Sequence, residues 1–298
     1  MSLKDRGVNQ GHLQPVVIVA LDGQDTLPIS STIDNEITSL IQGRYGSGVT
    51  DIDDIRMDAS TFSLQTLSYE HHEIHGGSHY YIEGHVSLDD AGVFYAKLMT
   101  PDTTKWSHFV WSIKSSGILD TKFYEIPTGG MAGGARSVIH ANNRNKNCWS
   151  GRQDGGDNQA TLTDSTQAWT VDALIGMQVF NQTDGSSAFI TDNDETTVTA
   201  VLAGGTGNDW DDGDVYEINN SQMVITGGVT VATSLGLLIS DAAVGGTGFK
   251  GDVGGASDRN DELVMMQNTT YLRTFVSGSD DNVISFKASW YEHSDRST

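Results

Sequence analysis

The sequence is short of cysteine, of positive charge and of long apolar runs. Cys148 is the one cysteine, so no disulfide can form within the chain and no thiolate cluster can hold a metal. Only 17 lysines and arginines stand against 39 aspartates and glutamates, and the net charge of −22 disfavours nucleic acid or an anionic membrane as the partner. No run of about 18 apolar residues occurs, and residues 1–11 lack the apolar stretch of a secretory signal. We therefore expect a soluble protein made in the cytoplasm.

Glycine and strand-forming residues are abundant instead. The 298 residues include 34 glycines and only 4 prolines, with Val, Thr, Ile, Tyr and Trp scattered between them. This balance is typical of strands joined by tight turns, and sustained helical periodicity is scarce. We predict an all-β protein: an antiparallel β-sandwich or jelly-roll-like domain with an extended N-terminal arm and an inserted small β module.

Turn-like separators divide the chain into four predicted parts. These are an arm at residues 1–57, a first part of the sandwich at 58–158, the inserted module at 159–220 and a second part of the sandwich at 221–298. In the arm, residues 15–21 are expected to form a strand and residues 34–41 a short helix. Sandwich strands are expected at residues 63–74, 80–88, 93–99, 107–114, 122–126, 222–225, 229–234, 262–266, 270–276 and 283–291, with a long glycine-rich loop at 245–255.

Histidines crowd the start of the sandwich. In a strand His71, Glu73 and His75 would share one face, and this triplet has donor atoms that zinc or iron accepts. The helical zinc-protease pattern does not fit His72-Glu73-Ile74-His75, because its two histidines are four residues apart and these are three apart. The other interpretation places the imidazoles at a subunit contact, satisfied by carboxylates or carbonyls. We expect no metal and no other cofactor, and His71, Glu73 and His75 are the candidates should a metal bind.

Two segments repeat the triplet Tyr-Glu-His, near the start and the end of the sandwich. We expect Tyr69-Glu70-His71 and Tyr291-Glu292-His293 to lie on strands and to mark adjacent edges that close one sandwich. Aromatic and imidazole side chains are common at the centres of interfaces. The residues that we expect at an assembly interface are Tyr69, His72, His79, Trp149, Tyr291 and His293.

Signals of catalysis are missing from the sequence. No Gly-x-Ser-x-Gly elbow and no Gly-Lys-Ser/Thr phosphate loop occurs. The Asp-rich residues 208–214 do not match a calcium-binding EF-hand loop, because Trp210 would occupy a ligand position. We expect a solvated turn there, and no enzymatic activity.

Several blocks of the sequence resemble a family of tailed-phage virion proteins. The blocks are specific in combination, follow the order of the family and leave residues 159–220 outside them. They are DAST (58–61), SLQT (63–66), YEHHEIHGGSHYY (69–81), TPDTTKWSH (100–108), NNRN (142–145), MQNTTYL (266–272) and WYEH (290–293). Within the insert, FNQTDGS (180–186) and NDWDDGD (208–214) are similar to small β modules of other phage structural proteins. The resemblance implies a structural component of the virion and carries no catalytic residue.

The function expected from this resemblance is that of a capsid cement or decoration protein. It would bind the outside of the major capsid shell and stabilise it, so that its location is the outer capsid surface of the virion after synthesis in the host cytoplasm. Its partners would be the major capsid protein and copies of itself, as a homotrimer. The alternative is a head-fibre, tail-fibre or tail-tip protein that binds a host surface receptor. Exposed Trp149 and Trp210 would suit this alternative.

Overall fold

The structure is a computed structural model. It describes residues 42–44, 52–54, 69–101, 105–231, 234–245 and 262–294. The chain divides into two compact units, Met1–Thr66 and Leu67–Thr298. In the first unit, β1 (Gln42–Arg44) pairs antiparallel with β2 (Ile52–Asp54). The strand and the helix that we expected at residues 15–21 and 34–41 lie outside the described residues.

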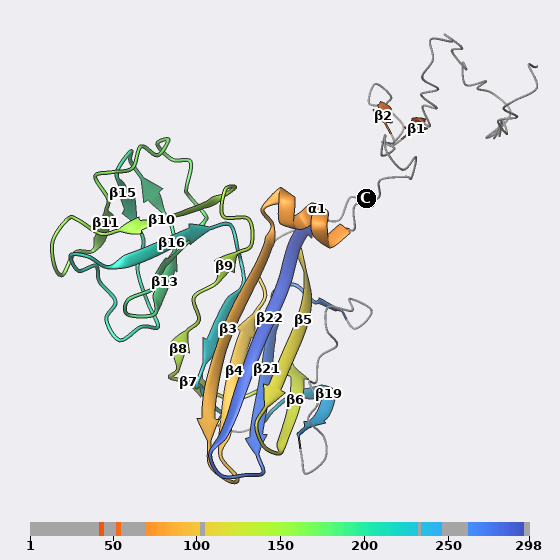
Figure 1. The fold of residues 1–298 in the computed structure, drawn as a ribbon. Helices are drawn as coiled ribbons and strands as arrows, with labels where there is room; N and C mark the ends of the chain where they lie inside the picture. The colour runs from red at the N-terminus through yellow and green to blue at the C-terminus, as the bar shows by residue number, and fades with distance from the viewer. Residues whose placement is uncertain are drawn as a thin grey trace, which may run out of the picture. The chain divides into compact units, whose positions relative to one another are not determined.

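The second unit is built on two antiparallel sheets that face each other (Figure 1). The five-stranded sheet has the order β20 (Leu263–Met265), β5 (Lys105–Ser115), β22 (Asn282–Ser294), β3 (His79–Leu88) and β9 (His140–Ala141). The six-stranded sheet has the order β19 (Leu237–Val244), β6 (Leu119–Glu125), β21 (Thr270–Ser277), β4 (Val93–Met99), β17 (Val224–Gly227) and β8 (Ala135–Arg136). A short ribbon joins β18 (Thr230–Val231) to β7 (Met131–Ala132).

The core lies between these two sheets because their strands alternate apolar and polar side chains. In β5, Phe109, Trp111 and Ile113 belong to the hydrophobic clusters, so His108 and Lys114 point to the other face. The ring of Trp111 meets that of Phe275 of the opposite sheet edge-on, with centroids 6.3 Å apart. The prediction of an all-β, antiparallel sandwich is confirmed.

The positively charged side chain of Arg273 is buried in this core. The guanidinium of Arg273 in β21 lies 5.8 Å from the ring centroids of both Trp111 and Phe123. Its Nε donates a 2.9 Å hydrogen bond to Oγ1 of Thr121 on β6. Burial lowers the pKa of Arg273 to about 10, because the charged form loses its hydration.

A smaller β module follows β9 in the chain. One of its sheets has the order β10 (Cys148–Arg152), β16 (Val215–Asn219), β12 (Gln178–Asn181) and β13 (Ser186–Phe189). The other has the order β11 (Thr161–Thr163), β15 (Thr197–Thr199) and β14 (Asp192–Asn193). The module has its own core, in which Trp210 is 0% exposed and Trp149 packs from the side. β10 precedes residue 159 and pairs with β16 along its whole length.

The helix α1 (Tyr69–Gly76) corrects the prediction of a strand at residues 63–74 where the structure describes it, over residues 69–74; residues 63–68 lie outside the described residues. Gly77 adopts a positive φ of 82°, its N–H donates to the carbonyl of Ile74, and the N–H of Ser78 donates to that of Glu73. These bonds form the Schellman closure that ends a helix. The Ser78 hydroxyl also donates to the Glu73 carboxylate. That contact spans five residues, about 16 Å in an extended strand, so an extended strand cannot make it.

Two other expectations differ from the structure. Tyr291-Glu292-His293 lies on β22, which is the central strand of its sheet and is flanked by β5 and β3. Tyr69-Glu70-His71 lies on α1, so the two triplets do not mark adjacent strand edges. The strand β19 occupies residues 237–244, where the sequence pattern predicts no strand. The glycine-rich loop predicted at 245–255 follows it, and residues 246–255 lie outside the described residues.

Candidate functional site

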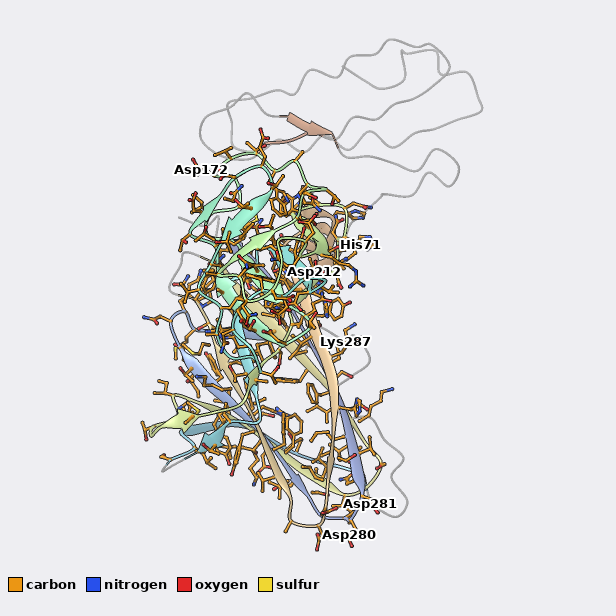
Figure 2. All side chains as sticks on the ribbon, turned by 90° about the vertical axis from the view of Figure 1, so that its left-hand side faces the viewer. His71, Asp172, Asp212, Asp280, Asp281 and Lys287 are labelled. Carbon is orange, nitrogen blue, oxygen red and sulfur yellow. The ribbon has the colours of Figure 1, made fainter. Side chains whose placement is uncertain are left out.

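Segments that are far apart in the sequence meet at one end of the sandwich. β3 begins and β22 ends there, because His79 pairs with Tyr291. The N–H of Glu292 donates to the carbonyl of Ser78, just after α1, and the N–H of Asn142 donates to that of His79, both at 3.0 Å. Figure 2 labels His71 near this end, and Asp280 and Asp281 at the opposite end. We call the first the α1 end. It comprises α1, residues 78–79, 105–108, 140–147, 262 and 290–293.

The histidines of α1 do not form the triplet expected from a strand. His71 and His75 lie one helical turn apart with stacked rings, centroids 4.8 Å apart, and both are exposed. Glu73 turns inward, where it is buried and bonded to Ser78 and, at 3.4 Å, to Nδ1 of His72. Glu73 therefore shares no face with His71 and His75.

The loop 142–147 contacts β3, α1 and the module through its side chains. The side chain of Asn142 contacts Nδ1 of His79 at 2.7 Å, and that of Asn143 donates to the carbonyl of His75 at 3.2 Å. Nη1 of Arg144 lies 2.6 Å from Oε1 of Glu217 on β16. Asn142 and Asn143 of the block NNRN thus contact His79 and His75 of the block YEHHEIHGGSHYY, so contacts at this end connect the two blocks.

Glu217 is the buried acid of this junction. Burial alone would raise its pKa, but hydrogen bonds from His140 and Arg144 outweigh burial and hold the pKa of Glu217 below its ordinary value. The Nδ1 of His140 lies 3.0 Å from Oε2. Cys148 also faces this carboxylate, and burial, followed by the charge of Glu217, raises the pKa of the thiol to about 12. A thiol that stays protonated at neutral pH is not a nucleophile.

Glu292 is a further buried carboxyl group at this end, beside Glu73 and Glu217. Its oxygens accept hydrogen bonds from Nε1 of Trp290 at 3.0 Å, from the hydroxyl of Ser221 at 3.0 Å and from the N–H of Gln222 at 2.9 Å. Burial raises the pKa of Glu292, and these hydrogen bonds only partly offset that effect. The group joins β22 of one sheet to the segment that leads into β17 of the other.

A third cluster lies on the outer face of the five-stranded sheet. Nδ1 of His108 contacts the carboxylate of Glu262, which also accepts a 2.8 Å hydrogen bond from the hydroxyl of Tyr291. Nε2 of His108 lies 2.7 Å from Nε2 of His293, within hydrogen-bond distance. His108 ends the block TPDTTKWSH, but no local pattern pairs it with Glu262. The pairing of β20, β5 and β22 brings the two residues together.

The other expected interface residues occupy varied surroundings. His72 is exposed on α1, whereas His79 and Tyr291 are buried. The backbone of Tyr69 opens α1, and its side chain lies outside the described part of the structure. Trp149 is partly buried against the core of the module. Trp210, expected to be exposed for receptor binding, lies inside that core, which corrects the expectation.

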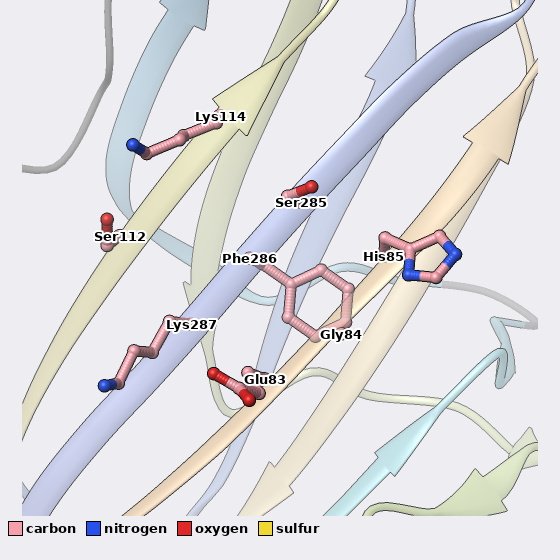
Figure 3. A pocket seen from close by; sticks show the side chains of 8 residues that line it. All are labelled: Glu83, Gly84, His85, Ser112, Lys114, Ser285, Phe286 and Lys287. Carbon is pink, nitrogen blue, oxygen red and sulfur yellow. The ribbon is translucent and has the colours of Figure 1, made fainter.

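Two further surfaces lie away from the α1 end. An open hollow of about 500 Å³ lies on the outer face of the five-stranded sheet, lined by polar side chains of β3, β5 and β22 (Figure 3). Lys287 and Lys114 are among them, and Nζ of Lys287 lies 4.9 Å from the ring centroid of Tyr81. At the edge of the six-stranded sheet, β19 exposes Leu237 (63%) and Leu238 (46%).

Across the described residues, no three side chains of His, Cys, Asp or Glu gather as metal ligands. No described helix is long and apolar enough to cross a membrane. The chain matches no model of a protein family and no curated protein.

Proposed function

We propose that this chain is a non-enzymatic structural component of a bacteriophage virion, a capsid cement or decoration protein on the outside of the major capsid shell. The observation that carries the proposal is the edge strand β19. Among the described strands it pairs with β6 alone, and it presents Leu237, Leu238 and Ile239 at the surface. An apolar strand edge is a ready template for pairing with another chain.

Two further features support this proposal. The net charge of −22 favours a position outside the shell, away from packaged DNA. Three of the blocks that resemble tailed-phage virion proteins, YEHHEIHGGSHYY, NNRN and WYEH, are hydrogen-bonded at the α1 end, through the contacts of Asn143 with His75 and of Glu292 with Ser78. The partners that we propose are the major capsid protein and two further copies of this chain, in a trimer.

The alternative function is a head-fibre, tail-fibre or tail-tip protein that binds the host surface. The open hollow beside Lys287 and Tyr81 favours it, because polar and aromatic groups on an open sheet face suit a polar receptor. The burial of Trp210 removes one of the two aromatic side chains on which this alternative relied.

Copy number in purified virions separates the two functions. A cement protein is expected at hundreds of copies per particle, and a count of about a dozen would contradict it. A map of the intact particle would show whether β19 adjoins another chain. Leu238→Asp should abolish incorporation, whereas Val201→Asp, at a module residue that is 86% exposed, should leave it unchanged. Equal incorporation of both variants would count against β19 as the assembly edge.

A further inference from the structure

The helix α1 brings two imidazoles to one face. His71 and His75 are four residues apart, so they lie one above the other on the helix surface. Their rings already stack, with centroids 4.8 Å apart, and both side chains are exposed. Rotation about the side-chain torsions is therefore sufficient to turn one nitrogen of each ring toward a common point.

The backbone that carries these histidines is held in place. Gly77 closes the C-terminal end of α1, and Asn143 donates to the carbonyl of His75 at 3.2 Å. The buried Glu73 fixes the opposite face through Ser78. The two imidazoles thus project from a helix whose position does not depend on a ligand, which reduces the entropy lost on binding.

We propose that His71 and His75 bind one divalent transition-metal ion, of the class of Zn²⁺, Ni²⁺ and Cu²⁺, through one nitrogen of each ring. Imidazole nitrogen suits these ions, whereas Mg²⁺ and Ca²⁺ require oxygen ligands. Two histidines at this spacing on one helical face are a recurrent source of two zinc ligands. No third side chain of His, Cys, Asp or Glu joins them among the described residues, so the described part of the chain supplies two ligands to the ion.

Glu73 takes no part in this site. Its carboxylate is buried and accepts the hydrogen bond of Ser78, on the side of α1 away from His71 and His75. His72 is the matched comparison, since it is exposed on the same helix but is not four residues from another histidine. The proposal does not depend on the proposed virion function.

Calorimetric titration of the full-length chain without a histidine tag tests the proposal. Zn²⁺ and Ni²⁺ are expected to bind with one ion per chain, and Mg²⁺ is the control for weak binding to acidic side chains. His71→Ala and His75→Ala should each weaken Ni²⁺ binding at least about tenfold, because even the loss of an outer-shell partner of a metal ligand weakens binding roughly 10–100-fold. His72→Ala should bind as the wild type does.

Two results would overturn the proposal. One is a wild-type chain that binds Ni²⁺ no more tightly than Mg²⁺. The other is a loss of binding in His72→Ala as large as that in His71→Ala. Circular dichroism and thermal unfolding of each variant check that the fold is intact, which is expected because all three side chains are exposed.

Discussion

Arg144 and Glu217 form an ion pair, with Nη1 and Oε1 2.6 Å apart, that links the loop after β9 to the module. The carboxylate is 1% exposed, whereas the guanidinium is 48% exposed. The pair is therefore asymmetric. Loss of the arginine leaves a buried negative charge with fewer donors, whereas loss of the carboxylate leaves an arginine that water can hydrate.

Arg144→Ala should lower the free energy of unfolding by about 1–3 kcal/mol, because a charged hydrogen bond to the buried Glu217 is lost. Lys146→Ala, in the same loop at an exposed position, should change it by less than about 0.5 kcal/mol. Urea unfolding followed by tryptophan fluorescence measures both. Equal changes in the free energy of unfolding for the two substitutions would show that the ion pair between Arg144 and Glu217 does not stabilise the fold.

Acidification should weaken the same junction. The folded-state pKa of Glu217 lies below its ordinary value of 4.5, so its contribution to stability is present above that value and is lost as the pH falls through the folded-state pKa. Glu217→Gln should therefore flatten the decline in stability at acidic pH. Unfolding midpoints measured from pH 7 to pH 3 check this, and parallel curves for the two proteins would refute it.

Glu292 should show the opposite pH dependence. Burial raises its folded-state pKa, so its contribution is fully present below the unfolded value of 4.5 and is lost as the pH rises through the folded-state pKa. The stability of Glu292→Gln relative to the wild type should accordingly increase from acid to neutral pH. A relative stability that stays constant or decreases over this range would contradict a raised pKa of Glu292.

Alanine substitutions at the two neighbouring glycines that end α1 should change the free energy of unfolding in opposite directions. Gly77→Ala should lower the free energy of unfolding by about 1–2 kcal/mol, because φ is 82° and an added Cβ would lie 3.1 Å from the carbonyl oxygen of Lys146. At Gly76 the nearest atom is 3.7 Å away and the backbone is helical, so Gly76→Ala should be stabilising by up to about 1 kcal/mol. Thermal unfolding measures both variants, and a melting temperature that changes in the same direction in both would contradict the prediction.

Cys148 should react slowly with thiol reagents until the protein unfolds. Its pKa of about 12 leaves almost no thiolate at pH 8. Labelling with an aromatic disulfide reagent should be much slower than that of a small free thiol, and denaturant should restore the rate. Rapid labelling of the native protein would contradict the burial of this thiol beside Glu217.

Local sequence patterns predicted the sandwich well and the α1 end poorly. The strand expected at residues 93–99 is β4, because turn residues bracket a run that opens with the strand formers Val93, Phe94 and Tyr95. In contrast, HHEIH reads as a strand by alternation, and α1 forms because Gly77, Ser78 and Asn143 fix it through contacts outside the run. β19 was missed because it is an edge strand whose side chains do not alternate between buried and exposed.

The candidate site was predictable only in part. The blocks NNRN and WYEH were singled out, but not their partners. Glu217 meets Arg144 across the pairing of β10 with β16, and Glu262 meets His108 across the pairing of β20 with β5. Such partners depend on strand register between distant segments, which a single sequence does not display.

The pairing of β10 with β16 places Cys148 directly opposite Asn219. Residues opposite each other in an antiparallel pair have Cα atoms about 5 Å apart, so the chain leaves the sandwich and returns to it at nearly the same point. The module, residues 148–219, can therefore be deleted or replaced as one segment. A linker of about one or two residues would join residue 147 to residue 220. A deletion that began at residue 160 would instead keep β10 and remove β16, the strand with which it pairs.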